Sequence, residues 1–318
     1  MEKNPHWRIN KQMNYPFQLI DYKKEGSINQ PDILHERPFT AFGSGFSDDA
    51  RLFISGEALD TAINTSIAVG EPLLITGEPG TGKTQAAYYA AEKLGIKPVL
   101  HFQVKSDTTA RDLLYNFDAV QYFHDAAIKK DKIEKADYIE ERLLWKAMKS
   151  KHPRLLLIDE IDKASRDFPN DLLHELDQMK FTITETGKEI ESSLSMRPIV
   201  FITSNSERRL PEPFLRRCVY HHIEFDRRIL EKAIQKRLHE FKGLSDDFIK
   251  MALERFLSLR SKALRKLPAT GEFIVWLRVL AMTAKIHPRR LEEDLSKLPY
   301  LGVLLKDHQD IRDIMNKK

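Results

Sequence analysis

Residues 72–84 read Pro-Leu-Leu-Ile-Thr-Gly-Glu-Pro-Gly-Thr-Gly-Lys-Thr, and this stretch decides the fold of the chain. Its first five residues form a short apolar run that is typical of a buried strand. Residues 77–84 then follow the pattern Gly, four free positions, Gly, Lys and Ser or Thr, which joins a strand to a helix. Backbone N–H groups in such a glycine-rich loop turn inward and hold phosphate oxygens together with the helix N-terminus. The stretch therefore predicts a site for a nucleoside triphosphate.

We expect every residue of this loop to line the bound phosphates. Lys83 would reach the β- and γ-phosphates, and the Thr84 hydroxyl would ligate Mg²⁺. A glycine-rich turn that binds nothing is the alternative, but a strand before it and a helix over residues 84–94 argue against that alternative. The predicted loop residues are Gly77, Glu78, Pro79, Gly80, Thr81, Gly82, Lys83 and Thr84.

A second apolar run, residues 154–158, ends in the acidic pair Asp159 and Glu160. The carboxyl ends of parallel strands face the ligand crevice of an α/β sheet. Asp159 would therefore hold Mg²⁺, and Glu160 would orient and deprotonate the attacking water. Strands that end in acids are common, so this interpretation depends on the phosphate loop upstream.

A third apolar run, residues 198–203, is followed by Asn205. A side-chain amide at this position can hold the lytic water against Glu160 without adding charge; alternatively, Asn205 only turns the chain. Arg216 and Arg217 follow at the end of a short helix. They either complement the helix dipole or supply charge to a phosphate bound elsewhere.

Apolar strands that alternate with helices predict an α/β fold with a parallel sheet covered on both faces. Residues 99–103 are a further strand candidate, residues 109–150 are expected to be mostly helical, and residues 181–190 are expected to form a hairpin. After residue 225 the pattern is helical and amphipathic, including helices over 270–286 and 288–306. The expected division is an extended N-terminal segment (1–45), an αβα nucleotide-binding domain (46–225) and a small all-helical lid domain (226–318).

The composition excludes several classes of protein. Apolar residues make up 42% and charged residues 31%, and no apolar run is long enough to span a membrane. The single cysteine, Cys218, excludes an internal disulfide framework, and the polar N-terminus has no signal core, so we expect a cytoplasmic location. The net charge of +4 leaves a nucleic-acid partner possible but does not indicate one.

Four phrases resemble the AAA+ superfamily and, within it, the MoxR-like ATPases, which are close to the dynein-related AAA modules. They are PLLITGEPGTGKTQ, KSDTTARDLLYNFDAVQYFHDA, LLLIDEIDKA and FITSNSERRLPEPFLRRC, and the resemblance covers residues 50–306. It implies that Lys83 and Thr84 belong to the Walker A motif, that Asp159 and Glu160 form Walker B, and that Asn205 is sensor 1. The arginine finger falls on Arg217. Arg216 competes for this role because Cys218 replaces the usual aromatic residue.

The resemblance also implies ATP and Mg²⁺ as ligands, a hexameric ring of identical subunits, and remodelling of a protein partner such as a von Willebrand A domain protein. The segment near residues 110–135 would hold an insert that faces the ring's pore. Its aromatic residues, such as Tyr122 and Phe123, either belong to the core or grip a substrate. One departure concerns the third lid helix, where Glu272 stands near the usual position of a sensor-2 arginine. Arg278 or a neighbouring subunit would then replace that arginine, or the function is absent.

Two other functions remain open from the sequence. One is a nucleic-acid-associated or restriction-type NTPase, which could use GTP. The other is a scaffold that binds nucleotide without hydrolysing it, although the intact Glu160 and the paired Arg216 and Arg217 speak against this reading.

Overall fold

The computed structural model describes residues 45–128, 133–283 and 289–316. The extended segment expected at residues 1–45 lies outside these ranges, apart from Gly45 at the start of α1 (Gly45–Asp49). Within the described ranges, none of the helices combines the length and the apolar character that crossing a bilayer requires.

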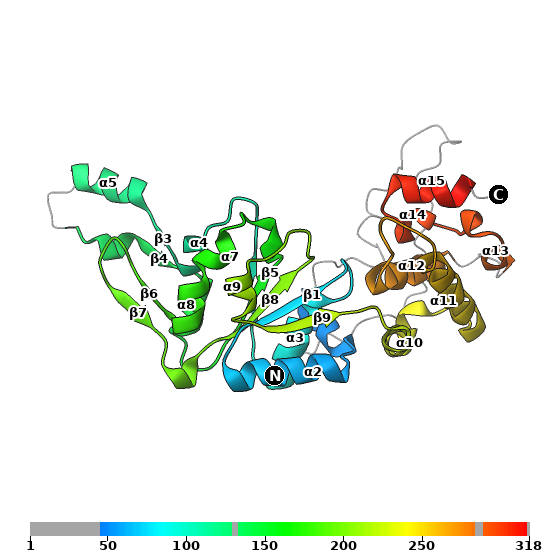
Figure 1. Ribbon diagram of the computed structural model, residues 1–318, viewed down its shortest axis with the longest axis horizontal. Helices are drawn as coiled ribbons and strands as arrows, with labels where there is room; N and C mark the ends of the chain where they lie inside the picture. The colour runs from blue at the N-terminus through cyan, green and yellow to red at the C-terminus, as the bar shows by residue number, and fades with distance from the viewer. Residues whose placement is uncertain (1–44, 129–132, 284–288, 317–318) are drawn as a thin grey trace, which may run out of the picture.

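Five parallel strands form the central sheet (Figure 1). Their order is β2-β5-β8-β1-β9, so β1 lies between β8 and the edge strand β9. Gly77, the last residue of β1, opens the phosphate loop, and the expected apolar runs supply four of the strands. The predicted α/β class is therefore confirmed. The strands are β1 (Leu73–Gly77), β2 (Leu100–Gln103), β5 (Leu155–Asp159), β8 (Ile199–Ser204) and β9 (Val219–Ile223).

Helices cover both faces of this sheet because alternate strand residues point to opposite sides. Leu73 and Ile75 pack with α2 (Glu57–Val69) and α3 (Lys83–Leu94). Leu74 packs on the opposite face, which a second group of helices covers. This three-layer arrangement confirms the predicted αβα domain. The second group consists of α4 (Arg111–Leu114), α6 (Leu143–Met148), α7 (Phe168–Asp171), α8 (Leu173–Gln178) and α9 (Glu212–Leu215).

The expectation of a mostly helical stretch over residues 109–150 was wrong in part. Here β3 (Tyr115–Phe117) and β4 (Ile139–Glu141) pair as an antiparallel ribbon on either side of α5 (Ala119–Ile128). Strands this short show no alternating pattern, and their hydrogen bonds join segments that are far apart in the chain. Local periodicity therefore does not reveal them.

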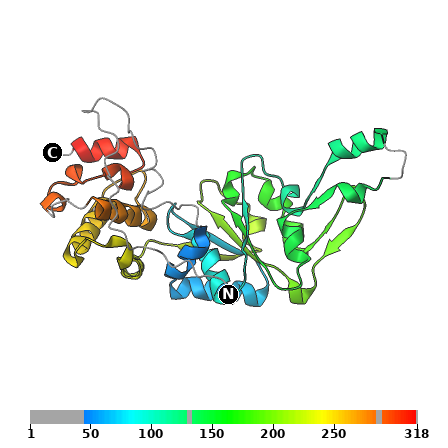
Figure 2. The same ribbon diagram turned by 180° about the vertical axis from the view of Figure 1, so that it is seen from behind.

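The hairpin expected at residues 181–190 is present. β6 (Lys180–Thr182) pairs with β7 (Glu189–Glu191), and Gly187 takes the left-handed conformation, at a φ of 71°, that its turn requires. Both views show β6 and β7 beside β3, β4 and α5, extending from the end of the sheet domain opposite the C-terminal helices (Figures 1 and 2). We call this extension the arm.

The elements after β9 are helical, and we keep residue 226 as the proposed domain boundary. A core centred on Phe256, Phe273 and Trp276 holds them together, and the Trp276 indole donates a 2.7 Å hydrogen bond to the Pro299 carbonyl. A continuous helix over residues 288–306 is not formed, because Pro299 lacks an N–H group and Tyr300 takes a φ of 57°. The helices are α10 (Arg227–Lys236), α11 (Asp246–Arg260), α12 (Thr270–Met282), α13 (Arg289–Glu292), α14 (Leu301–Leu304) and α15 (His308–Asn316).

Candidate functional site

The phosphate loop joins β1 to α3, and two of its glycines are required by its shape. Gly77 has a φ of 151°, and a Cβ there would lie 2.7 Å from the Ile223 carbonyl oxygen. Gly82 has a φ of 92° and directly precedes the first turn of α3. A side chain at either position would strain the backbone, so the loop keeps the tight curve that phosphate binding needs.

Lys83 is buried within this loop. Its ammonium group donates to the carbonyl oxygens of Gly77 (2.9 Å) and Glu78 (3.0 Å). Burial lowers the pKa of Lys83, and the nearby carboxylates of Asp162 and Asp159 counter part of this shift. The loop therefore holds a cation at its inner surface, where a phosphate oxygen would replace the carbonyls as partner.

Asp159, at the carboxyl end of β5, is the centre of a hydrogen-bond network. Thr84 Oγ1 donates to its carboxylate at 3.0 Å, Thr203 Oγ1 donates at 2.5 Å, and His101 Nε2 lies 3.2 Å away. Burial by itself raises the pKa of Asp159, but these hydrogen bonds outweigh it and bring the pKa below its ordinary value. The carboxylate therefore stays ionised beside the Thr84 hydroxyl.

This pair of oxygen donors fits Mg²⁺, which prefers one or two carboxylates and completes its shell with phosphate and water. No group of three or more His, Cys, Asp or Glu side chains is arranged for a metal ion among the residues that the structure describes. Thr84 and Asp159 would hold the ion together with phosphate oxygens of a bound nucleotide.

Glu160 is held by side chains from two neighbouring strand ends and by Lys163 from its own loop. Asn205 Nδ2 donates to Oε1 at 3.1 Å, Gln103 Nε2 donates to Oε2 at 2.6 Å, and the Lys163 ammonium also contacts Oε2. The Glu160 backbone has a φ of 60°, and its N–H donates to Thr203 Oγ1 at 2.8 Å. A non-glycine residue in this strained conformation is frequent at functional sites. Parallel pairing thus brings Glu160 and Asn205 together, as their sequence positions predict.

Asp162 ties the loop after β5 to the loop after β8. Its carboxylate is 5% exposed and accepts the backbone N–H groups of Asn205 (3.2 Å) and Glu207 (3.0 Å). Arg208 adds a hydrogen bond to the carbonyl of Ala164 at 2.8 Å. The two loops therefore form one unit, which sets the position of the Asn205 amide relative to Glu160.

Sequence reasoning missed His101, Gln103, Asp162 and Lys163 as members of this site. One signal was available for Gln103, because it is the polar residue that ends the apolar run at residues 99–103. The carboxyl ends of neighbouring parallel strands meet at one edge of the sheet, so Gln103 had to lie near Glu160 once the order β2-β5-β8 was known.

The structure does not bring Arg216 or Arg217 to Glu160. Arg217 Nε pairs with Asp177 at 2.5 Å, and its guanidinium also donates to the Pro213 carbonyl at 3.1 Å. The Arg216 side chain is exposed and has no hydrogen bond or ion pair to any other described residue. Neither arginine contacts the phosphate loop of its own chain within the described ranges.

The helical domain touches the phosphate loop directly. The N–H of Gly271, in the first turn of α12, donates to the Gly80 carbonyl at 3.2 Å. Glu272 caps its own helix by accepting the Ala269 N–H at 3.1 Å. Arg278, which the sequence left open as a replacement for sensor 2, pairs with Glu240 inside the helical domain at 2.8 Å.

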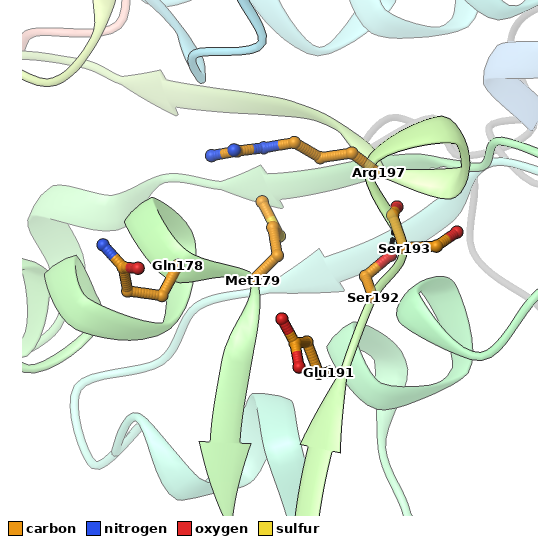
Figure 3. A pocket seen from close by; sticks show the side chains of 6 residues that line it. All are labelled: Gln178, Met179, Glu191, Ser192, Ser193 and Arg197. Carbon is orange, nitrogen blue, oxygen red and sulfur yellow. Dashed lines mark hydrogen bonds between the residues drawn. The ribbon is translucent and has the colours of Figure 1, made fainter.

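A separate hollow of about 360 Å³ lies at the base of the β6–β7 hairpin (Figure 3). Arg197 crosses it and donates to the carbonyl oxygens of Leu176 and Asp177, at the end of α8. None of its lining residues belongs to the phosphate loop or to the acidic pair, so it is not part of the nucleotide site. They are Gln178, Met179, Glu191, Ser192, Ser193 and Arg197.

A parallel sheet of this order, with a glycine-rich loop between β1 and α3 and an acidic pair at the carboxyl end of β5, defines a P-loop nucleotide-binding domain. Residues 72–218 match the family model of the AAA domain, dynein-related subfamily. This part of the chain is therefore similar to the AAA domains of that subfamily.

This chain is similar to a crystal structure of a candidate ATPase from Cytophaga hutchinsonii, at 16% sequence identity and a TM-score of 0.40. The superposition covers 86% of this chain and 93% of that chain. A likeness this weak supports no conclusion about this chain. No curated protein matches the sequence.

Proposed function

We propose that this protein is an ATP-hydrolysing motor subunit that assembles into a homo-oligomeric, hexameric ring and remodels a protein partner. The observation that supports hydrolysis best is the convergence of Gln103, Glu160 and Asn205 at the carboxyl ends of β2, β5 and β8. They lie beside the pair formed by Thr84 and Asp159. The narrower MoxR-like assignment and a cytoplasmic location are parts of the same proposal.

Each residue has a distinct part in the proposed reaction. Lys83 exchanges its contacts with the loop carbonyls for the β- and γ-phosphates of ATP. Thr84 and Asp159 would hold Mg²⁺, which would neutralise charge on the transferred phosphoryl group. Glu160 accepts the proton of the attacking water through Oε1, and the Asn205 amide, 3.1 Å from that oxygen, donates to the water and orients it.

The site would be completed by an arginine from the adjacent subunit. Arg216 is exposed and has no ion pair with another residue that the structure describes, which supports it as the residue free to reach a neighbour's γ-phosphate. Arg217, which the family resemblance favours, forms an ion pair with Asp177 of its own chain. It would have to break this ion pair, or reach the phosphate while still paired with Asp177. Both residues therefore remain candidates for the charge that acts in trans.

The arm supports action on a protein. On α5, Val120, Phe123 and Ile128 are 82%, 67% and 66% exposed, whereas Tyr122 packs against Phe117 at a ring distance of 5.6 Å. Helix α5 therefore has an anchored side and an apolar exposed side. Such a surface suits contact with apolar segments of a protein substrate. A von Willebrand A domain protein is the partner class that we propose.

Phosphate release from ATP tests the proposal. Lys83→Ala should lose nucleotide binding, whereas Glu160→Gln should bind ATP but turn over at least about a hundredfold more slowly. Glu254→Gln is a matched control, because Glu254 is an exposed acid on α11. Turnover that is equal in the wild type and in Glu160→Gln would refute the proposed mechanism.

Two further measurements test the finer parts. Light scattering with ATP and Mg²⁺ should show a ring; a protein that stays monomeric at high concentration would contradict it. Parallel assays with GTP, with and without DNA, address the restriction-type alternative. A preference for GTP or stimulation by DNA would favour the restriction-type alternative and contradict the proposed action on a protein substrate.

A further inference from the structure

Arg260, the last residue of α11, connects three segments around the phosphate loop. Its side chain is only 11% exposed. The guanidinium donates to Glu78 Oε2 at 3.1 Å and to the Pro268 carbonyl, and it lies over the ring of Phe225 at 4.0 Å. It therefore joins the helical domain, the segment between β9 and α10, and the phosphate loop.

Glu78 is the residue of the phosphate loop that receives this contact. Its carbonyl accepts hydrogen bonds from Lys83 Nζ at 3.0 Å and from Thr81 Oγ1 at 2.8 Å, while its carboxylate faces Arg260. One residue thus bonds both to the cation expected to bind phosphate and to a cation of the helical domain. Glu78 is thus the residue that lies between these two contacts.

A second contact holds the same two parts together. The Gly271 N–H donates to the Gly80 carbonyl, and a Cβ at Gly80 would lie only 2.8 Å from Glu272 Oε2. The start of α12 is therefore packed closely on the loop. Glu272 brings a negative charge close to Gly80. Arg260 brings a positive charge to the loop through its contact with Glu78.

Other arginines of the helical domain are committed elsewhere. Arg255, one and a half turns before Arg260 on α11, donates to the carbonyl oxygens of Leu291 and Glu292. Arg278 pairs with Glu240. Neither contact reaches the phosphate loop, which makes Arg255 a suitable control.

We propose that Arg260 is a positioning residue of the nucleotide site: it neutralises Glu78 and so lets the loop accept a polyphosphate while the helical domain stays docked on it. The inference rests on the proposed function of the loop as a nucleotide site. A bound nucleotide would bring several negative charges next to the Glu78 carboxylate. A cation beside that carboxylate offsets the repulsion between these like charges. Arg260 is already in that place, with a side chain that is 11% exposed beside the 40% exposed side chain of Glu78.

The test is the affinity for a fluorescent ADP analogue in the full chain. Arg260→Ala should weaken binding by about tenfold, because it leaves Glu78 unpaired beside the phosphates. Arg260→Lys should lose about threefold, since an ammonium keeps the charge but not the fork geometry. Glu78→Gln should bind about threefold more tightly, because the charge of Arg260 is then left for the phosphates.

The double variant Arg260→Ala with Glu78→Gln distinguishes electrostatics from simple packing. We expect it to recover affinity to within about threefold of the wild type, whereas a packing defect would persist in it. If Arg260→Ala does not fold, tighter binding by Glu78→Gln and weaker binding by Arg260→Lys still test the pair.

The outcomes separate this proposal from the one on which it rests. If the wild type and Arg255→Ala do not bind the analogue, both proposals fail. If they bind it and Arg260→Ala binds equally well, or the double variant shows no recovery, the role of Arg260 alone is overturned.

Discussion

Replacing Asp162 by alanine would take the shared acceptor from two backbone amides without removing a hydrogen bond of the phosphate loop. The Asp162 carboxylate is 5% exposed, so water does not readily take its place. A buried N–H group left without a partner costs about 1–3 kcal/mol. Asn205 is partly exposed and Glu207 is exposed, so loss of both bonds should destabilise this loop by about 1–3 kcal/mol. Asp162→Asn keeps one acceptor oxygen and should lose about half as much.

The catalytic consequence follows from the position of Asn205. Its amide lies 3.1 Å from Glu160 Oε1, and a displacement of about 1 Å in a reacting geometry can slow a reaction by about a hundredfold. We expect Asp162→Ala to lower kcat by about that factor and to change nucleotide affinity by less than about threefold. Hydrogen exchange at the Asn205 and Glu207 amides, measured alongside phosphate release, checks both parts.

Asp310 provides the matched control for this experiment. It is 1% exposed and accepts two backbone N–H groups, from Arg265 (2.8 Å) and Lys266 (3.0 Å), in the helical domain. Asp310→Ala removes the same chemistry far from Glu160. Equal turnover in the two variants, or unchanged protection of the Asn205 amide in Asp162→Ala, would refute the positioning role of Asp162.

Three other predictions follow from single residues. Of Arg216→Ala and Arg217→Ala, the variant that removes the trans charge should keep nucleotide binding but lower turnover by about a thousandfold or more; wild-type turnover in both would exclude this pair. Burial raises the pKa of Cys218 to about 12, so Ellman's reagent at pH 8 should modify it only in urea, and fast labelling of the folded protein would contradict this. Burial raises the pKa of Asp159, but hydrogen bonds outweigh burial and lower the pKa below its ordinary value. The stabilising contribution of Asp159 is therefore complete above the unfolded-state pKa of about 3.9 and is lost as the pH falls through the lower folded-state pKa. Urea unfolding between pH 6 and pH 2 should therefore show a smaller acid loss in Asp159→Asn than in the wild type.

The parts of the fold that the sequence predicted share one property: their signal is local. The strand before Gly77, the strand before Asp159 and the strand before Asn205 are continuous apolar runs, because both faces of a central parallel strand are buried. The β6–β7 turn is marked by Gly187 for a similar reason, since its backbone needs a left-handed conformation.

The β3–β4 ribbon and the broken segment around Pro299 show where local patterns fail. Tyr115–Phe117 reads as part of a helix, but hydrogen bonds to Ile139–Glu141 make it a strand. Around Pro299, the apolar spacing suggests one helix, yet the Trp276 indole binds the Pro299 carbonyl and the chain turns there. At Tyr115–Phe117 a contact with a distant segment overrides the local preference, whereas at Pro299 the missing N–H group ends the helix.

The candidate site divides in the same way. Sequence by itself determined the phosphate loop at residues 77–84 and the acidic pair after β5, because their chemistry lies in consecutive residues. Only the tertiary structure decided that Gln103 reaches Glu160 and that Arg260 reaches Glu78 across the boundary between the sheet and the helices. Those contacts depend on strand order and on the docking of helices, which join residues far apart in the chain and leave no periodic trace along it.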